Sequence, residues 1–229
     1  YTTDPRVVAE ARKMPTVSFD ELLEMTATGC PKPAMRSVEY AHRHGVKLHV
    51  RSAFTWEPGT WVVEEDPEME HAVVRAITHD LSEAKITVSG VPDRPGVAAQ
   101  LFRSLADRNV NVDMIVQNTS DHGVTDISFT VPHSDLEVSR AVVDELQAEL
   151  GATSCSADPD IARVSVIGAG MKANPGIAAS MFQHLADAGI NIDMISTSTI
   201  RISCVVRQDQ AEQAVAILHA AFELHRSDY

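Results

Sequence analysis

The pattern of apolar and polar positions repeats itself once along the chain. Residues 95–115 (PGVAAQLFRSLADRNVNVDMI) align with residues 175–195 (PGIAASMFQHLADAGINIDMI), and 12 of the 21 positions are identical. In both copies a β-rich run precedes a Pro-Gly turn, and apolar residues then recur at helical spacing. A match of this length indicates a structural duplication, so we expect two copies of one folded module.

The first copy predicts a complete order of strands and helices. In chain order, the pattern predicts strand 84–90, helix 96–108, strand 110–118, strand 124–131, helix 134–150 and an edge strand 152–157. Ser134 is the expected N-cap of the second helix, and Glu137 stands where it would complete a capping box. The order β-α-β-β-α-β is the split pattern of ferredoxin-like folds.

The second copy lacks its fourth strand. Its predicted elements are strand 162–168, helix 175–188, strand 191–197, strand 200–206 and helix 209–222. A strand-like run at 71–79 lies upstream and has no partner of its own, so we expect it to complete the second module. The first module is then inserted in the second. The expected domains are 82–158 for the first module and 66–81 with 159–229 for the second.

Residues 1–60 follow another pattern. They predict a helix over 18–29 with a Ser18/Glu21 capping box, a helix over 35–45 stopped by Gly45, and a strand over 46–53. This alternation is typical of the end of an α/β domain. The predicted fold class is therefore α+β, with two ferredoxin-like modules preceded by a remnant of an α/β domain.

Composition and charge narrow the classes of function. The formal net charge is −13 and the pI is about 5.1, which disfavours binding to nucleic acid. No apolar run approaches the ~20 residues of a membrane span, and the N-terminus lacks the apolar core of a signal peptide. Three well-separated cysteines and ten histidines without metal-ligand spacing predict a cytoplasmic protein with no metal site. Because the chain starts at Tyr, we expect it to be part of a longer protein.

The repeated turn suggests a binding chemistry. A Pro-Gly turn before a helix presents free backbone N–H groups and a partial positive charge, which suits the carboxylate of a small molecule. Asp93 stands just before the first turn, where it could receive an ammonium group, and Asn111 and Asn191 begin the next strands. Together these groups match a free amino acid. Each turn taken alone is equally consistent with a plain connection, and the Asn and Asp side chains with local capping.

Several phrases together resemble a known family. The segments GVPDRPGVAAQLF, VNVDMIVQN, VSVIGAGMKANPGIAASMF and INIDMISTSTIRISCVV resemble the paired ACT domains at the C-terminus of bacterial aspartokinases. The opening YTTDPR and the region from SFDELLEM to VKLHVRS resemble the end of the amino-acid-kinase catalytic domain of that enzyme. The resemblance covers essentially the whole chain.

The resemblance implies a regulatory role. Aspartokinases transfer the γ-phosphoryl group of ATP, with Mg²⁺, to L-aspartate. Their ACT domains bind lysine, threonine or both between modules of partnered chains and thereby inhibit the kinase. The resemblance also implies a homodimer, or pairing with a kinase-bearing subunit. It implies no cofactor for the ACT portion itself. The implied nucleotide contacts are Tyr1, Asp4, Arg6 and Lys32. The implied effector contacts are Asp93, Gly96, Val97, Ala98, Gln117, Asn118 and Asp126 on one side, and Met171, Asn174, Gly176, Ile177, Asn191, Ile192 and Ser198 on the other.

The chain departs from the family pattern in two places. It has no Lys-Phe-Gly-Gly-Thr-Ser phosphate motif, so the chain by itself is expected to be inactive as a kinase and no catalytic residue is assigned. The Gly-Ala-Lys segment of the family corresponds to GCPKP in this chain. Pro31 occupies the position of the family's lysine, and Lys32 follows one position later. These departures leave an alternative open: a stand-alone amino-acid sensor with a degenerate kinase remnant.

Overall fold

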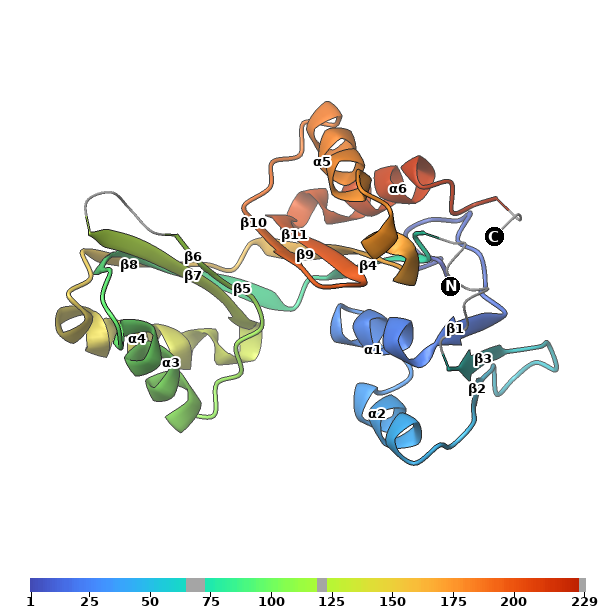
Figure 1. The fold of residues 1–229 in the computed structure, drawn as a ribbon, viewed down its shortest axis with the longest axis horizontal. Helices are drawn as coiled ribbons and strands as arrows, with labels where there is room; N and C mark the ends of the chain where they lie inside the picture. Colours follow the sequence, from blue (N-terminus) through green and yellow to red (C-terminus); the bar gives the residue numbers. More distant parts are fainter. Residues whose placement is uncertain (65–72, 119–122, 227–229) are drawn as a thin grey trace. The chain divides into compact units, whose positions relative to one another are not determined.

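The computed structural model describes residues 1–64, 73–118 and 123–226, which Figure 1 traces as a ribbon. The chain divides into two compact units, Tyr1–Leu81 with Arg163–Tyr229 and Ser82–Ala162. Because the larger unit consists of residues on both sides of the smaller one, the smaller unit is inserted into its sequence. Within the described ranges no helix is both long enough and apolar enough to cross a membrane.

The unit Ser82–Ala162 is a four-stranded antiparallel sheet with two helices. Its elements are β5 (Glu83–Pro92), α3 (Val97–Asp107), β6 (Ile115–Gln117), β7 (Val124–Pro132), α4 (Leu136–Leu150) and β8 (Ser154–Asp158). The strand order is β6-β7-β5-β8, and both helices cover one face of this sheet (Figure 1). This arrangement confirms the predicted β-α-β-β-α-β order.

The core of this unit follows from the apolar alternation along β5. Ile86 and Val88 are fully buried, while Thr87 between them is partly exposed, as expected for a sheet covered on one face. Leu101 and Leu105 lie one helical turn apart on α3 and join the same core, with Phe129 of β7. Each such buried side chain contributes roughly 1.5–3 kcal/mol, so packing of one face stabilises the module.

The predicted capping box at the start of α4 is wrong. A turn of 3₁₀ helix over His133–Asp135 precedes the helix, and it makes Asp135 the N-cap, without a side-chain cap. The hydroxyl of Ser134 donates to the Asp135 carboxylate over 3.0 Å instead of capping the helix. Glu137 consequently lies in the first turn of α4 and not at the position that a capping box requires.

Strand β6 is shorter than the predicted strand 110–118. The backbone N–H of Met114 donates to the side-chain hydroxyl of Thr130 over 3.1 Å, and the N–H of Asp113 donates to the Thr130 carbonyl. Because a side chain takes the Met114 N–H, regular pairing with β7 begins only at Ile115. The beginning of the predicted strand is therefore a connecting segment.

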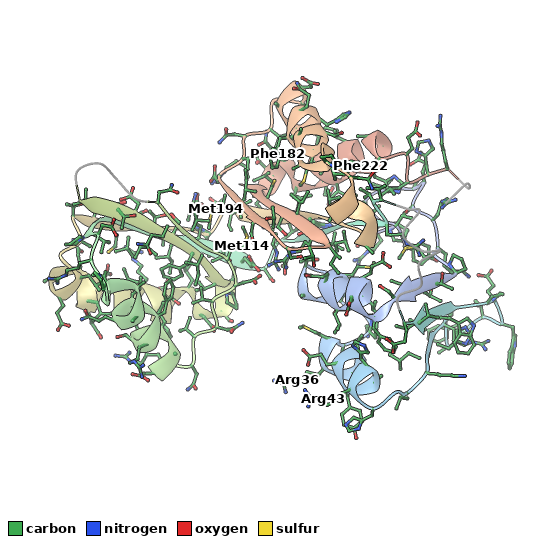
Figure 2. All side chains as sticks on the ribbon, in the orientation of Figure 1. Arg36, Arg43, Met114, Phe182, Met194 and Phe222 are labelled. Carbon is green, nitrogen blue, oxygen red and sulfur yellow. The ribbon has the colours of Figure 1, made fainter. Side chains whose placement is uncertain are left out.

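The larger unit contains a second sheet of the same design. Its elements are β4 (Ala76–Asp80), β9 (Ile161–Ile167), α5 (Ile177–Asp187), β10 (Met194–Thr197), β11 (Arg201–Arg207) and α6 (Ala211–Ala221). The strand order is β10-β11-β9-β4, and β4 pairs antiparallel with β9. The upstream run thus supplies the missing strand, which confirms the predicted insertion. Met114 and Met194 hold equivalent positions in the two modules and are 3% and 5% exposed, so both belong to the core (Figure 2).

The N-terminal part of the larger unit is a small three-stranded sheet with two helices. Its elements are β1 (Thr16–Ser18), α1 (Phe19–Ala27), α2 (Met35–Arg43), β2 (Leu48–Val50) and β3 (Thr60–Val63), with strand order β1-β3-β2. The Ser18 hydroxyl accepts the Glu21 N–H at 3.1 Å, and the Glu21 carboxylate accepts the Ser18 N–H at 3.2 Å. This confirms the predicted capping box. Strands β1 and β3 were not predicted from the sequence.

Helix α1 is joined to the second sheet by buried polar contacts. The hydroxyls of Thr28 and Thr78 lie 2.6 Å apart, directly after α1 and within β4. The guanidinium of Arg163 on β9 donates to the Ala27 carbonyl over 2.9 Å, and this arginine is only 1% exposed. The end of α1 is therefore fixed on the β4–β9 strand pair.

A buried histidine joins the first residues of the chain to α6. The Nε2 atom of His219 lies 2.9 Å from the Thr2 hydroxyl, which also accepts the Arg12 N–H. Burial, together with the positive charges of His225 and Arg12, lowers the pKa of His219 below its usual value of 6.5. The folded chain consequently favours the neutral imidazole.

The stability of the larger unit is expected to fall as the pH drops below about 6.5. The unfolded chain takes up the proton first, so the contribution of His219 is complete above its unfolded pKa and is lost as the pH falls through the lowered folded pKa. Urea unfolding at about pH 7.5 and about pH 5.5 measures the change. Tryptophan fluorescence reports this unit through Trp61, which is half-buried and stacks on the ring of His49 in the same unit. His219→Gln should reduce the difference between the two pH values, and an unchanged difference would contradict the assignment.

Candidate functional site

Both Pro-Gly turns lead directly into a helix. Gly96 (φ +99°) and Gly176 (φ +109°) adopt the left-handed conformation and are the N-caps of α3 and α5. Neither helix has a side-chain cap on its first N–H groups, and a Cβ added at either glycine would meet no atom within 4 Å. Each turn therefore offers N–H groups and a partial positive charge beside open space.

The structure gathers the predicted effector residues of the first module at one end of its sheet. The end of β5 pairs with the start of β7 (Pro92 opposite Val124), and so does the end of β6 (Gln117 opposite Ile127). Helix α3 begins at the same end, directly after β5. The predicted residues located there are Asp93, Gly96, Val97, Ala98, Gln117, Asn118 and Asp126.

The two acids of this group have different surroundings. The Asp126 carboxylate accepts the Gly90 N–H over 2.8 Å, at the point where the register of β5 shifts. It therefore holds the irregular end of β5 in place. Asp93 is exposed on the turn before α3, and its backbone N–H donates to the Gly123 carbonyl. Its carboxylate is accessible to a ligand that binds at the helix start.

The predicted residues of the second module fall into two groups. The first group lies on the β9–α5 connection, at the first residue of α5 or directly after β10, and it consists of Met171, Asn174, Gly176, Ile177 and Ser198. The N–H of Gly168 donates to the Ile200 carbonyl over 3.0 Å, which places the end of β9 beside the β10–β11 turn. Asn191 and Ile192 precede β10, at the opposite end of that strand from Ser198. Within one module, Asn191 and Ile192 therefore do not lie beside the residues of the first group.

Local contacts account for two of the predicted amide side chains. The Asn191 amide donates to the Asp193 carboxylate over 3.3 Å, and the Asn174 amide donates to the Gly170 carbonyl over 2.8 Å. Asn191 is exposed, so its remaining hydrogen-bonding capacity faces solvent in this chain. Asn174 instead closes the loop that leads to Gly176, and this closure positions the start of α5.

The predicted nucleotide contacts surround one cavity in the N-terminal part of the larger unit. Tyr1, Asp4, Arg6 and Lys32 all line this cavity, whose volume is about 520 Å³. Apolar side chains of β1 and α1 form part of its wall, including Leu22 and Met25. The structure thus brings together four residues that the sequence places up to 31 positions apart.

A carboxylate orients the arginine at this cavity. Arg6 donates to Asp4 through Nε and Nη2, with the shortest distance at 2.6 Å, and the Arg6 backbone N–H adds a further bond. The hydrogen bonds from Arg6 lower the pKa of Asp4 below its usual value, so the pair stays charged. Arg6 itself is exposed and its charge is available to an anionic ligand.

Sequence reasoning missed other polar residues of the cavity. Lys13 lies near the start of the chain, and His79 comes from β4; both line the cavity. No local motif connects His79 to YTTDPR, because β4 meets the start of the chain only in the folded structure, where the Ile77 N–H donates to the Thr2 carbonyl over 2.8 Å. Among the residues that the structure describes, no group of three or more His, Cys, Asp or Glu side chains is arranged to hold a metal ion.

Comparison with known proteins assigns both modules. Residues 85–151 match a family model of the ACT domain, and residues 164–222 match a second model of the ACT domain. The aspartokinase of Mycolicibacterium smegmatis is 46% identical over 232 residues, which cover 100% of this chain and 55% of that protein. The chain spans about half the length of the curated relatives it matches.

Solved structures agree with this assignment. The regulatory subunit of aspartate kinase from Thermus thermophilus, in its ligand-free form, is 38% identical with a TM-score of 0.63, over 66% of this chain and 99% of that one. Aspartokinase III of E. coli with aspartate and ADP is 27% identical (TM-score 0.80; 96% and 49% covered). The same enzyme with lysine and aspartate is 26% identical (TM-score 0.77; 97% and 49% covered). The chain therefore belongs to the aspartokinase family and carries the paired ACT domains of its regulatory portion.

Proposed function

We propose that the two ACT modules bind lysine, threonine or both, and that binding inhibits an aspartokinase of which this chain is a part. The observation that carries the proposal is the duplicated helix start, where free N–H groups suit the carboxylate of an amino acid. In the first module the accessible carboxylate of Asp93 is suited to the ammonium group of the same ligand. The lysine complex of the E. coli relative supports this class of ligand.

The two sites are expected to be unequal. The sequence has Asp93 before the first turn and Ala173 at the equivalent position before the second. Asn191 and Ile192 lie at the far end of β10 from Gly176, so a site that uses both groups requires a second module from a partner. We therefore propose that the chain forms a homodimer, or pairs with a kinase-bearing subunit, through its ACT modules. The location we propose is the cytoplasm.

The cavity at the N-terminal end favours a second function, nucleotide binding in the whole protein. Arg6, Lys13 and Lys32 supply positive charge around a cavity with apolar walls, which suits the phosphates and the ring system of ATP. Lys32 lines the cavity although it stands one position later than the family motif expects. In the whole protein, ATP with Mg²⁺ would phosphorylate L-aspartate. The alternative of an inactive sensor predicts that the cavity takes no nucleotide.

Calorimetric titration of the chain with L-lysine, L-threonine and ADP tests these proposals together. We expect heat from at least one amino acid, and Asp93→Ala should weaken its binding about tenfold or more, because a hydrogen bond between charged groups is worth about 1.5–3 kcal/mol. Asp107→Ala is the matched control, since it removes an exposed acid from the other end of α3.

Flat titrations with both amino acids would contradict effector binding. Equal weakening by Asp93→Ala and Asp107→Ala would show that net charge, and not a specific contact, is responsible. Heat from ADP favours the nucleotide function over the inactive sensor.

A further inference from the structure

One glutamate connects helix α1 to the hairpin turn of the second ACT module. The Oε1 atom of Glu24 accepts a hydrogen bond from the Ser198 hydroxyl over 3.1 Å, and its Oε2 atom lies 3.1 Å from Nη1 of Arg201. The side chains of Glu24 and Arg201 are 23% and 16% exposed. Partial burial makes this ion pair stronger than one at the open surface. Residues 174 positions apart in the sequence are thereby held in contact.

The turn that meets Glu24 also touches the loop that leads to the proposed effector site. The Ser198 N–H donates to the Arg201 carbonyl over 2.8 Å and closes the β10–β11 turn. From the same turn, the Ile200 carbonyl accepts the Gly168 N–H. Gly168 begins the connection that carries Met171 and Gly176, so a change in this loop reaches Ile200 through one hydrogen bond. The Ile200 N–H in turn donates to the Ser198 hydroxyl over 3.4 Å.

The other side of α1 forms part of the cavity wall. Leu22 and Met25 line the cavity, and the segment from Gly29 to Pro33, which follows the helix, lines it as well. The capping box fixes the start of α1. A shift at Glu24, near the end of the helix, therefore acts on the cavity wall and on the segment that contains Lys32.

We propose that Glu24 is a positioning residue that passes the ligand state of the second ACT module to helix α1 and the cavity wall, through Ser198 and Arg201. The Ser198 hydroxyl has one proton and donates it to Glu24. An effector that accepts this hydrogen bond in place of Glu24 weakens the contact between the β10–β11 turn and α1. This step rests on the proposed function, because it requires an amino acid at the second module.

Hydrogen–deuterium exchange of the full chain tests the coupling. The amides that report it are those of Thr28 and Cys30, which both donate to the Met25 carbonyl at the end of α1. Their exchange should become several-fold faster when L-lysine or L-threonine binds. In Glu24→Ala their exchange should be fast from the start and independent of the amino acid. By reciprocity, the amino acid should bind this variant about fivefold more tightly.

Controls separate coupling from loss of structure. Glu39→Ala removes an exposed glutamate from α2 and should preserve the ligand-dependent change in α1. Exchange within α2 shows whether the variants stay folded, and Glu24→Leu, which keeps an apolar stem but has no acceptor for the Ser198 hydroxyl, replaces the alanine variant if that one unfolds. Binding of an amino acid without any change in α1, or an unaltered change in the Glu24 variant, would overturn the role of Glu24 and leave the proposed function standing. No binding of either amino acid to the unmodified chain would overturn both.

Discussion

Replacing Gly29 by alanine is expected to lower the free energy of unfolding of the larger unit by about 3 kcal/mol or more. Gly29 follows α1 with φ +112°, a conformation that costs an alanine about 1–2 kcal/mol. A Cβ at this position would also overlap the carbonyl oxygen of His79, which belongs to β4. Since backbone cannot rotate aside as a side chain can, β4 or the end of α1 must move.

Gly45 provides the matched control for this substitution. It also follows a helix with positive φ (+62°), but a Cβ added there meets nothing within 4 Å. Gly45→Ala should therefore cost only the conformational part, about 1 kcal/mol. Urea unfolding followed by tryptophan fluorescence compares the two variants in the same unit. Equal losses would show that the close approach of Gly29 to β4 contributes nothing.

Replacing Asp80 by asparagine is expected to cost about 3 kcal/mol in the same measurement. Asp80 and Arg163 are register partners across β4 and β9, and the Asp80 carboxylate lies 3.4 Å from the arginine Nη2. Asparagine keeps the shape of the side chain but removes its charge. The guanidinium of Arg163, whose side chain is 2% exposed, would then lose a carboxylate in a site where water compensates poorly.

An exposed ion pair of the same unit controls for charge alone. Glu223 and Arg226 are 2.7 Å apart, and their side chains are 44% and 58% exposed. Such surface pairs contribute little, so Glu223→Gln should cost less than about 0.5 kcal/mol. If Asp80→Asn lowers the free energy of unfolding no more than Glu223→Gln does, the buried position of Arg163 does not depend on the Asp80 carboxylate.

The sequence predicts the two modules well because their information is local and repeated. Apolar spacing locates the α-helices α3, α4, α5 and α6 of the two modules, and the absence of a fourth strand in the second copy points to β4. The capping box of Ser18 forms, whereas the one expected at Ser134 does not, because a 3₁₀ turn takes its place. The short strands β1 and β3 have too few residues to show alternation, and they exist because they pair with each other.

The candidate sites are only partly readable from sequence. The glycine turns can be predicted, because a left-handed residue before a helix has a recognisable pattern. The environment of each side chain cannot, because it depends on distant partners. Ser198 is an example: resemblance to the family assigns it to the effector, and in the structure its hydroxyl donates to Glu24, from another part of the chain. Likewise His79 lines the cavity because β4 contacts the start of the chain, where the Ile77 N–H donates to the Thr2 carbonyl.

The pairing of β4 with β9 has a consequence for how the chain can fold. Asp80 and Arg163 lie opposite each other on neighbouring antiparallel strands, where Cα atoms are about 5 Å apart. The inserted segment therefore leaves and re-enters the larger unit at nearly the same point. Its own ends are also paired, since Lys85 lies opposite Asp158. Once the inserted module has formed, it closes its own loop, so the long sequence separation between β4 and β9 adds little entropic cost to their pairing.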